Sequence, residues 1–446
     1  MTARVKNMTS GSPGKLILFF AIPLMFGNIF QQLYTMVDTM VVGQVVGVKA
    51  LAALGAVDWI VWMILGIASG MTQGFSILVS QYYGAQNWEG LKKAVARSYI
   101  LTAILSAAVL AVSQAAAYPL LLFLNTPADI MGMALSYLRV ALCGVPFIAA
   151  YNCLASMLRA VGNSKSPLVA MILAALINIG LDMLFVAGFG WGVAGAAAAT
   201  VIGQTFSAVY CYLVVRKIQI LKIKKKDFKG EPGMDKTLLG MGVPVSLQNI
   251  IIAVGGLAVQ FAINGYGSLV VAGFTATNKM YGILELAGIS YGYAITAYVG
   301  QNLGAKEIGR IRRGVKSGAV MAVATSLFMS VVMLIAGRFI LGLFISGNPA
   351  QTEQVLDVAY RYLFILSVCL WILYLLYVFR SAIQGLGNTL LPMLSGVAEL
   401  FVRVIVVLIL PVFMGRDGIY FAEIGAWISA VVILIPGYKI ILKKFS

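Results

Sequence analysis

The sequence has no histidine, and charged residues make up only 11% of its 446 positions. Without histidine, the chain can contain neither the H-E-x-x-H pair of a metalloprotease nor the histidine base of a Ser-His hydrolase. It also has no G-x-x-x-x-G-K-[ST] loop, the usual cradle for the phosphates of ATP. We therefore expect a protein that is not an enzyme, needs no cofactor and does not use ATP directly.

Cysteine is also scarce, and all four cysteines lie within apolar runs, where a thiol behaves as a small hydrophobic group. No disulfide framework is expected. Apolar residues, by contrast, are abundant: 61% of the sequence is hydrophobic and the mean hydropathy is +0.95. This composition is typical of a protein that spans a lipid bilayer, whose hydrocarbon core requires roughly 20 apolar residues per helix.

The apolar runs predict an all-α membrane protein with twelve transmembrane helices. Short stretches rich in glycine, proline or basic residues separate the runs. The predicted helices cover residues 16–44, 51–80, 93–117, 131–155, 167–187, 192–215, 238–264, 269–299, 314–337, 352–379, 391–412 and 419–438.

The sequence is strongly basic, with 32 Lys and Arg residues against 15 Asp and Glu residues. Most of the basic residues fall in or beside every second loop, which predicts that these loops and both termini are cytoplasmic. The first apolar run is long and lacks a small-residue cleavage site, so we expect an uncleaved first helix. This sorting argues against nucleic acid as a partner and indicates a multi-pass protein of the inner (plasma) membrane.

The densest basic run, Lys222 to Lys229, lies between the sixth and seventh predicted helices and includes one acid, Asp227. Its simplest interpretation is a solvated linker, although such a run could also hold the headgroups of anionic lipids. We expect an N-terminal six-helix lobe, a basic cytoplasmic linker and a C-terminal six-helix lobe, over residues 1–215, 216–237 and 238–446.

Matching motifs relate the two lobes. Each motif is separated from its match by six predicted helices, an even number, so both copies lie on the same face of the membrane. Two parallel, pseudo-symmetric halves of this kind are typical of transporters, with the substrate path between them. We also expect tight turns with positive φ at the Gly-Ala and Gly-Asn motifs. The matches are Gln81-Tyr-Tyr-Gly84-Ala85 with Gln301-Asn-Leu-Gly304-Ala305, Arg159-Ala-Val-Gly162-Asn163 with Gln384-Gly-Leu-Gly387-Asn388, and Pro23 with Pro244.

Ionisable residues within the predicted helices are the most informative positions, because each costs about 2.5 to 3.5 kcal/mol near the helix centre. In the N-terminal lobe, Asp38 lies in the first helix, and Asn178 and Asp182 share one face of the fifth at i,i+4 spacing. Thr200 is in the sixth helix. Together these four residues predict a polar cluster whose oxygens suit a proton or a hard cation such as Na⁺. A structural hydrogen-bonding role is the alternative.

The C-terminal lobe has a different pattern of buried charge. Glu399 and Arg403 are spaced i,i+4 on the eleventh predicted helix and can neutralise each other. Lys279 and Glu285 do not share a face, so each is expected to pair across helices. Glu285, Glu399 and Arg403 are secondary candidates for function, with structural pairing an equal alternative.

The order of these motifs resembles the multidrug and toxic compound extrusion family over almost the whole chain. The resemblance depends on Pro23 with Val37-Asp38, the Gln81, Arg159 and Gln301 motifs given above, Asn178-Ile-Gly-Leu-Asp182 and Gly192-Val-Ala-Gly195-Ala-Ala-Ala-Ala-Thr200. Residues 244–264 contain Gln248 and Asn249 but no acid. The pattern therefore resembles the DinF-like prokaryotic branch more than the NorM-like branch, which has a glutamate in this helix.

The resemblance implies that cationic, amphipathic compounds leave the cell while H⁺ or Na⁺ enters. It places the ion site of the N-terminal lobe on Asp38, Asn178, Asp182 and Thr200, and implies that protonation of Asp38 is linked to bending of the first helix near Pro23. A Na⁺ ion would have its ligands among the same four residues.

The sequence therefore predicts an ion-coupled exporter of cationic drugs or metabolites that contacts membrane lipids and functions as a monomer. A lipid-linked saccharide flippase of the same superfamily is the transport alternative, but it would need a cationic cavity. A membrane-bound lipid-modifying enzyme is the alternative from another class. Its paired, metal-binding carboxylates are not evident, because the acids are scattered singly.

Overall fold

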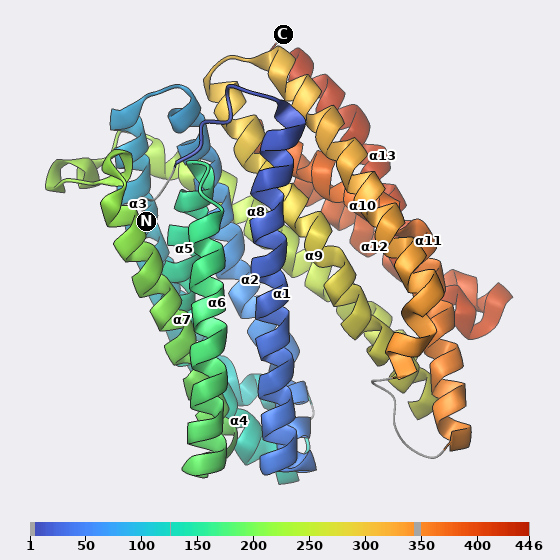
Figure 1. Cartoon of the computed structure of the whole chain (residues 1–446). Helices are drawn as coiled ribbons and strands as arrows, with labels where there is room; N and C mark the ends of the chain where they lie inside the picture. The colour runs from blue at the N-terminus through green and yellow to red at the C-terminus, as the bar shows by residue number, and fades with distance from the viewer. Residues whose placement is uncertain (1–4, 125, 343–348, 446) are drawn as a thin grey trace. The chain divides into compact units, whose positions relative to one another are not determined.

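The protein is an all-α membrane protein (Figure 1). Its structure, a computed structural model, describes residues 5–124, 126–342 and 349–445, apart from the side chains of Val48, Trp59, Ser268, Pro349 and Ala350. Over these residues the chain forms α-helices, short 3₁₀ turns and one π-helical segment, and no strand.

The first half of the chain forms long apolar helices that follow one another through short turns. The fourth predicted helix is divided in two: α4 and α5 meet at Gly144, before Pro146, with a bend of 43°. A π-helical segment, η1 (Met183–Gly188), continues directly from α6. The helices are α1 (Pro13–Val45), α2 (Val48–Gly84), α3 (Trp88–Phe123), α4 (Ala128–Cys143), α5 (Val145–Ala160), α6 (Lys165–Asp182) and α7 (Gly192–Lys217).

The second half repeats this arrangement. The linker that precedes it contains two 3₁₀ turns, η2 (Gln219–Leu221) and η3 (Lys225–Lys229), and a third, η4 (Gly415–Phe421), joins the last two helices. The helices are α8 (Met234–Asn264), α9 (Ser268–Gly304), α10 (Ile308–Gly342), α11 (Pro349–Gly385), α12 (Leu390–Met414) and α13 (Ala422–Lys443).

The described helices account for all twelve predicted spans. Nine stretches are long and apolar enough to cross a bilayer, and the bent pair α4–α5 makes a tenth. One of the nine, Leu390–Lys443, contains both α12 and α13, and the 37-residue α9 supplies the remaining span. Most observed helices extend several residues beyond the predicted ends, because hydropathy detects only the lipid-facing part of a helix.

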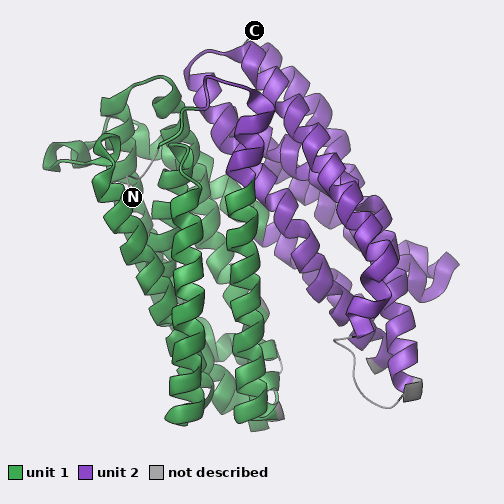
Figure 2. Ribbon diagram, viewed as in Figure 1, with its two compact units in different colours: residues 1–7, 22–249 green, residues 8–21, 250–446 purple. Residues whose placement is uncertain are grey.

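The helices form two compact units (Figure 2). Unit 1 comprises residues 1–7 and 22–249, and unit 2 comprises residues 8–21 and 250–446. The sequence predicted a division at the linker, and the observed grouping differs because α1 and α8 each contribute to both units. The chain changes unit next to Pro23 in α1 and a few residues after Pro244 in α8.

The turns between matching helices confirm the internal repeat. Gly162 and Gly387 have φ of 84° and 88°, and the side-chain oxygens of the following Asn163 and Asn388 each accept the backbone N–H three residues on, at 3.0 Å. In the Gly-Ala turns the positive φ falls two residues after the glycine, at Gln86 (55°) and Lys306 (61°).

Candidate functional site

Asp38 lies on the buried side of α1, at 6% exposure. Tyr34, one helical turn earlier, is also buried and therefore lies on the same face. Both residues come after Pro23, in the part of α1 that belongs to unit 1. A carboxylate has been placed there despite the cost of burying it, which indicates a specific purpose or a specific partner.

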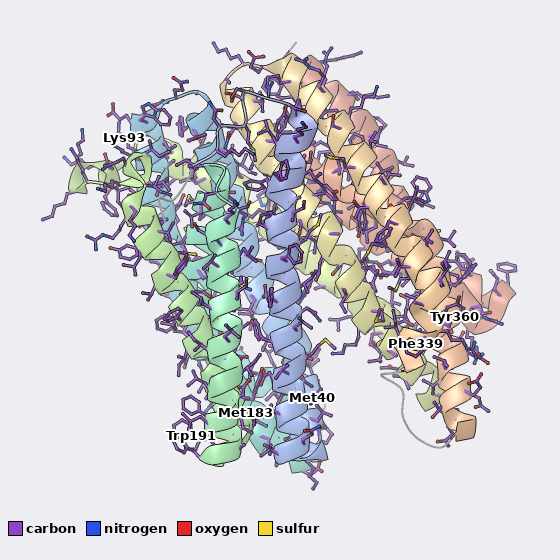
Figure 3. The ribbon with its side chains drawn as sticks, in the orientation of Figure 1. Met40, Lys93, Met183, Trp191, Phe339 and Tyr360 are labelled. Atoms are coloured by element: carbon purple, nitrogen blue, oxygen red, sulfur yellow. The ribbon has the colours of Figure 1, made fainter. Side chains whose placement is uncertain are left out.

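Helix α6 presents Asn178 and Asp182 to the interior of unit 1. Both side chains are buried, and Asp182 has no exposed surface. Asp182 is the last residue of α6, and the π-helical segment η1 begins at the next residue. π-Helical segments are rare and occur often at functional sites. Figure 3 labels Met183, the first residue of η1, and Met40 on α1.

Helix α7 completes the cluster with Thr200 and Gln204, one turn apart. The Asn178 side-chain amide donates to Thr200 Oγ1 at 3.3 Å, and the Gln204 amide donates to the Tyr34 hydroxyl at 3.0 Å. Helices α6 and α7 can approach closely because Gly203 has no side chain: a Cβ there would lie 3.1 Å from the Ala174 carbonyl oxygen. Small residues commonly permit such contacts between membrane helices.

The cluster has a surplus of buried acceptors. Within the described part of the chain, five buried oxygens from four side chains of this cluster receive no hydrogen bond. All five are acceptors when the carboxylates are ionised. Leaving a buried polar group unpaired costs about 1 to 3 kcal/mol, and more for a charged group. The atoms are Asp38 Oδ1, Asn178 Oδ1, Asp182 Oδ1, Asp182 Oδ2 and Gln204 Oε1.

The acids of this cluster also affect one another electrostatically. Asp182 interacts with Asp38, and Asp38 interacts with Asp58 of α2, which is exposed. Tyr137 of α4 lies within electrostatic range of all three acids. Like charges at such range repel, so a cation or a proton that binds there lowers the energy of the site. Carboxylate and amide oxygens are the ligands that hard cations prefer.

The structure therefore brings the four predicted site residues into one unit, with a direct bond between two of them. Sequence analysis did not identify Tyr34, Gln204 or Tyr137. The first two could have been found from spacing, since Tyr34 is four residues before Asp38 and Gln204 is four residues after Thr200. Tyr137 left no such signal, because α4 contributes no other residue to the cluster. The roles of Pro23 as a hinge and of the four residues as ion ligands stay predictions.

The buried charges of unit 2 are paired, but not as the sequence predicted. Glu399 forms an ion pair with Arg380 of α11, and Arg403 pairs with Glu423 of α13 at 2.7 Å. The predicted neutralisation of Glu399 by Arg403 within α12 is therefore wrong. Each charge is instead neutralised by a side chain from a neighbouring helix. The i,i+4 spacing within α12 brings Glu399 and Arg403 to one face of the helix but does not require them to pair.

Arg403 is also tied to α8. Its Nη1 donates to the Ile252 carbonyl oxygen at 3.2 Å, and a Cβ at Gly255 would lie 2.6 Å from the same nitrogen. Glu285 accepts a hydrogen bond from the Tyr377 hydroxyl at 3.3 Å, which satisfies the expectation of a partner on another helix. Lys279 is exposed and belongs to none of the ion pairs among the described residues, so its expected pairing is not observed.

Comparison with known families gives a match over most of the chain. The family model described as MatE matches residues 23–184 and again residues 244–409. The two matched segments each include one copy of the internal repeat, beginning at or next to Pro23 and at Pro244.

Similar proteins include two curated bacterial relatives. The chain is 27% identical over 440 residues to the probable multidrug resistance protein YoeA of Bacillus subtilis, which covers 95% of this chain and 93% of the relative. It is 27% identical over 364 residues to DNA damage-inducible protein F of Escherichia coli, covering 79% and 76%. A solved structure of a MOP superfamily transporter from Pyrococcus furiosus has the same fold, with a TM-score of 0.93, 24% identity and 99% coverage of both chains.

Proposed function

The chain belongs to the MatE family of multidrug efflux transporters, and from this premise we propose that it is a secondary antiporter. In this proposal it exports cationic, amphipathic drugs or metabolites in exchange for H⁺ or Na⁺. The exchange uses Asp38 and Asp182 as coupling carboxylates, with Asn178 and Thr200 as supporting groups.

The observation that carries this proposal is the set of five unpaired acceptor oxygens buried in unit 1. A structural polar cluster would balance donors and acceptors, because an unbalanced one destabilises the fold. A coupling site has the opposite requirement: it must gain free energy when an ion arrives and lose it when the ion leaves. The surplus of acceptors meets this requirement for either a proton or Na⁺.

The same residues give a chemical order to transport. When Asp38 and Asp182 are ionised, their charge in an apolar surrounding favours a cation, either the coupling ion or the exported compound. Entry of a proton, or of Na⁺ between the carboxylates and Asn178 Oδ1, neutralises the site and removes that attraction. Cation and coupling ion therefore compete for one negative site, and this competition is the minimal requirement for exchange.

The relatives support the type of substrate. YoeA is described as a probable multidrug resistance protein. An acidic site such as this one, with no buried basic side chain among the described residues of unit 1, suits organic cations. The alternative of a lipid-linked saccharide flippase gains no support, because its pyrophosphate would need unpaired buried cations. Within the described residues of unit 2, Arg380 and Arg403 are each committed to a glutamate.

We place the protein in the inner (plasma) membrane with both termini in the cytoplasm. The chain is a multi-pass membrane protein, and the arrangement of basic residues supports the orientation. Lys92 and Lys93 follow one member of the repeated turn, and Arg312 and Arg313 follow the other. Cytoplasmic loops carry such an excess of Lys and Arg. We expect the monomer to be the functional unit.

The test is ethidium flux into or out of proteoliposomes under an imposed pH gradient and, separately, an imposed Na⁺ gradient. The wild-type chain is compared with Asp38→Asn, which keeps the size of the side chain and removes its charge. Flux that follows one gradient and is lost in Asp38→Asn is the expected result, and it identifies the coupling ion.

Two outcomes would contradict the proposal. Full gradient-driven flux in Asp38→Asn would show that this carboxylate does not couple transport. Failure of both gradients to move ethidium through a correctly inserted wild-type chain would exclude export of this cation and redirect the search to lipid-linked or anionic substrates. Glu353→Gln serves as the matched control, because it removes an exposed acid whose partner Arg338 keeps a second acid, Asp357.

A further inference from the structure

The linker between α7 and α8 is basic to a degree that its surroundings do not neutralise. Residues 216–229 contain seven basic residues and one acid, Asp227. The basic side chains are all exposed, and none of them belongs to an ion pair among the described residues. We call these residues the linker surface: Arg216, Lys217, Lys222, Lys224, Lys225, Lys226 and Lys229.

The linker that carries these residues is folded against the protein. Ile218 and Leu221 are buried, at 3% and 1% exposure, in the hydrophobic core that also includes Val215 of α7. Asp227 is buried and accepts the backbone N–H of Lys224 at 2.6 Å. The apolar side of the linker therefore faces the protein, and this arrangement turns the lysines outward.

Helix α3 holds the linker in place, and its basic side chains form ion pairs with the acids near the linker. Arg97 donates to the Phe228 carbonyl oxygen at 3.1 Å and forms an ion pair with Asp235. Lys93 bonds Glu231 at 3.1 Å and Glu89 at 2.8 Å. Glu89 lies within electrostatic range of Lys226 but is already held by Lys93. The acids near the linker are thus occupied, and its lysines keep their charge available.

The position of the linker surface determines which molecules can bind to it. The linker follows directly from Lys217, the last residue of α7. Figure 1 shows it in yellow-green, projecting sideways from the end of that helix beside α3. Lys93 of α3, which bonds Glu231, is labelled in Figure 3. A sideways projection from the end of a membrane helix runs along the bilayer surface. Phe228, which lies between Asp227 and Lys229, is 38% exposed and adds an apolar ring to this surface.

We propose that the linker surface is a docking surface for the anionic phospholipid headgroups of the cytoplasmic leaflet. Clusters of four to eight basic residues next to a membrane helix attract such headgroups, and the attraction grows with each lysine. The sequence favoured a solvated linker, which would not hold its lysines in a fixed arrangement. The folded linker in the structure does hold them in one, and lipid docking needs such an arrangement. The proposal goes beyond the transport function and would stand if that function proved wrong.

The test measures lipid binding to the purified full chain in detergent by native mass spectrometry, with phosphatidylglycerol and phosphatidylcholine as probes. The quadruple variant K222Q/K224Q/K225Q/K226Q should bind phosphatidylglycerol roughly fivefold more weakly or worse, with phosphatidylcholine unchanged. The control K306Q/K316Q/K443Q/K444Q removes the same charge from exposed lysines elsewhere and should change binding by less than about twofold.

Two further arms distinguish binding of the lipid from a folding defect and from binding of phosphate alone. The variant K222R/K224R/K225R/K226R keeps the charge and should bind phosphatidylglycerol like the wild type, which also guards against a folding defect in the glutamine variant. Free glycerol phosphate should not displace the lipid. Equal losses in both glutamine variants, unchanged binding in the linker variant, or displacement by glycerol phosphate would each overturn the proposal.

Discussion

Unit 1 and unit 2 both bury carboxylates within their apolar helices, yet they satisfy them in opposite ways. In unit 2, Glu399 and Glu423 each face an arginine on a neighbouring helix. In unit 1, Asp182 accepts no hydrogen bond from the described residues on either oxygen, and Asp38 leaves one oxygen without a donor. The first arrangement is fixed by its partners, whereas the second is open to an ion. Matching halves of one repeat therefore differ in how they satisfy their buried carboxylates.

The difference teaches that buried acids in a membrane protein should be judged by their partners and not by their depth. Glu399 is as deeply buried as Asp38, at 3% against 6% exposure. Depth alone made both residues candidates for function. Only the distribution of arginines separates them, because a carboxylate already paired with a guanidinium gains little from a proton or Na⁺.

The largest expected effect concerns the paired unit. Arg380→Met removes the partner of Glu399 and leaves a buried charge uncompensated, which we expect to cost about 3–5 kcal/mol of stability. The measurement is thermal unfolding of the purified protein in detergent, together with folded yield. The double variant Arg380→Met/Glu399→Met, which removes both charges, should recover most of the loss. A double variant as unstable as the single one would show that the pair is not what Arg380 contributes.

The next effect tests the open unit. Asp182→Asn should reduce gradient-driven ethidium flux about 100-fold, equivalent to about 2.7 kcal/mol, because the site loses the charge that attracts cation and coupling ion. The same variant should unfold at the wild-type temperature or above it, since it removes an unpaired buried charge. A large fall in unfolding temperature would instead indicate a structural carboxylate and would remove the contrast between the units.

A smaller effect is expected from the hydrogen bond between Gln204 and Tyr34, beside the two carboxylates. Gln204→Leu deletes the donor to the Tyr34 hydroxyl, a neutral hydrogen bond that contributes about 1 kcal/mol. We expect about a fivefold fall in flux, with the ion dependence of transport unchanged. The measurement is flux at several magnitudes of the pH and Na⁺ gradients. A change of coupling ion in this variant would mean that Gln204 is itself an ion ligand.

The smallest effect concerns the helix that both units share. Pro23→Ala restores a backbone donor within α1 next to the point where the chain passes from unit 2 to unit 1. Flux should fall about threefold or less, equivalent to about 0.7 kcal/mol, while ethidium binding at equilibrium stays at the wild-type value. Weaker binding with unchanged turnover would argue against a hinge at this position.

Much of the fold could be predicted because it depends on local features. Twelve apolar runs became membrane helices, and the repeated Gly-Asn motifs became turns with matching φ at Gly162 and Gly387. Hydropathy could not locate the break at Gly144, two residues before Pro146. The ends of most helices were predicted several residues short of their observed positions, because polar helix ends look like loops in a hydropathy profile.

In the candidate site, too, local relations could be predicted and contacts between distant helices could not. Asn178 and Asp182 were identified as one face of a helix, since a spacing of four residues fixes that relation before any tertiary contact forms. Gln204 and Tyr34 meet across α7 and α1, 170 positions apart in the chain. Nothing in the spacing of the sequence specifies such a contact.

The sequence by itself determined the membrane helices, their repeat, the sorting of basic residues and the acids that each helix face presents. These properties follow from composition and from periodicities of a few residues, which the chain carries in any arrangement. Only the tertiary structure decided that Glu399 meets Arg380 and that Arg403 meets Glu423. It also decided that Asp38 and Asp182 face no basic side chain among the described ion pairs, because partnership between buried charges depends on distances across helices, which packing sets.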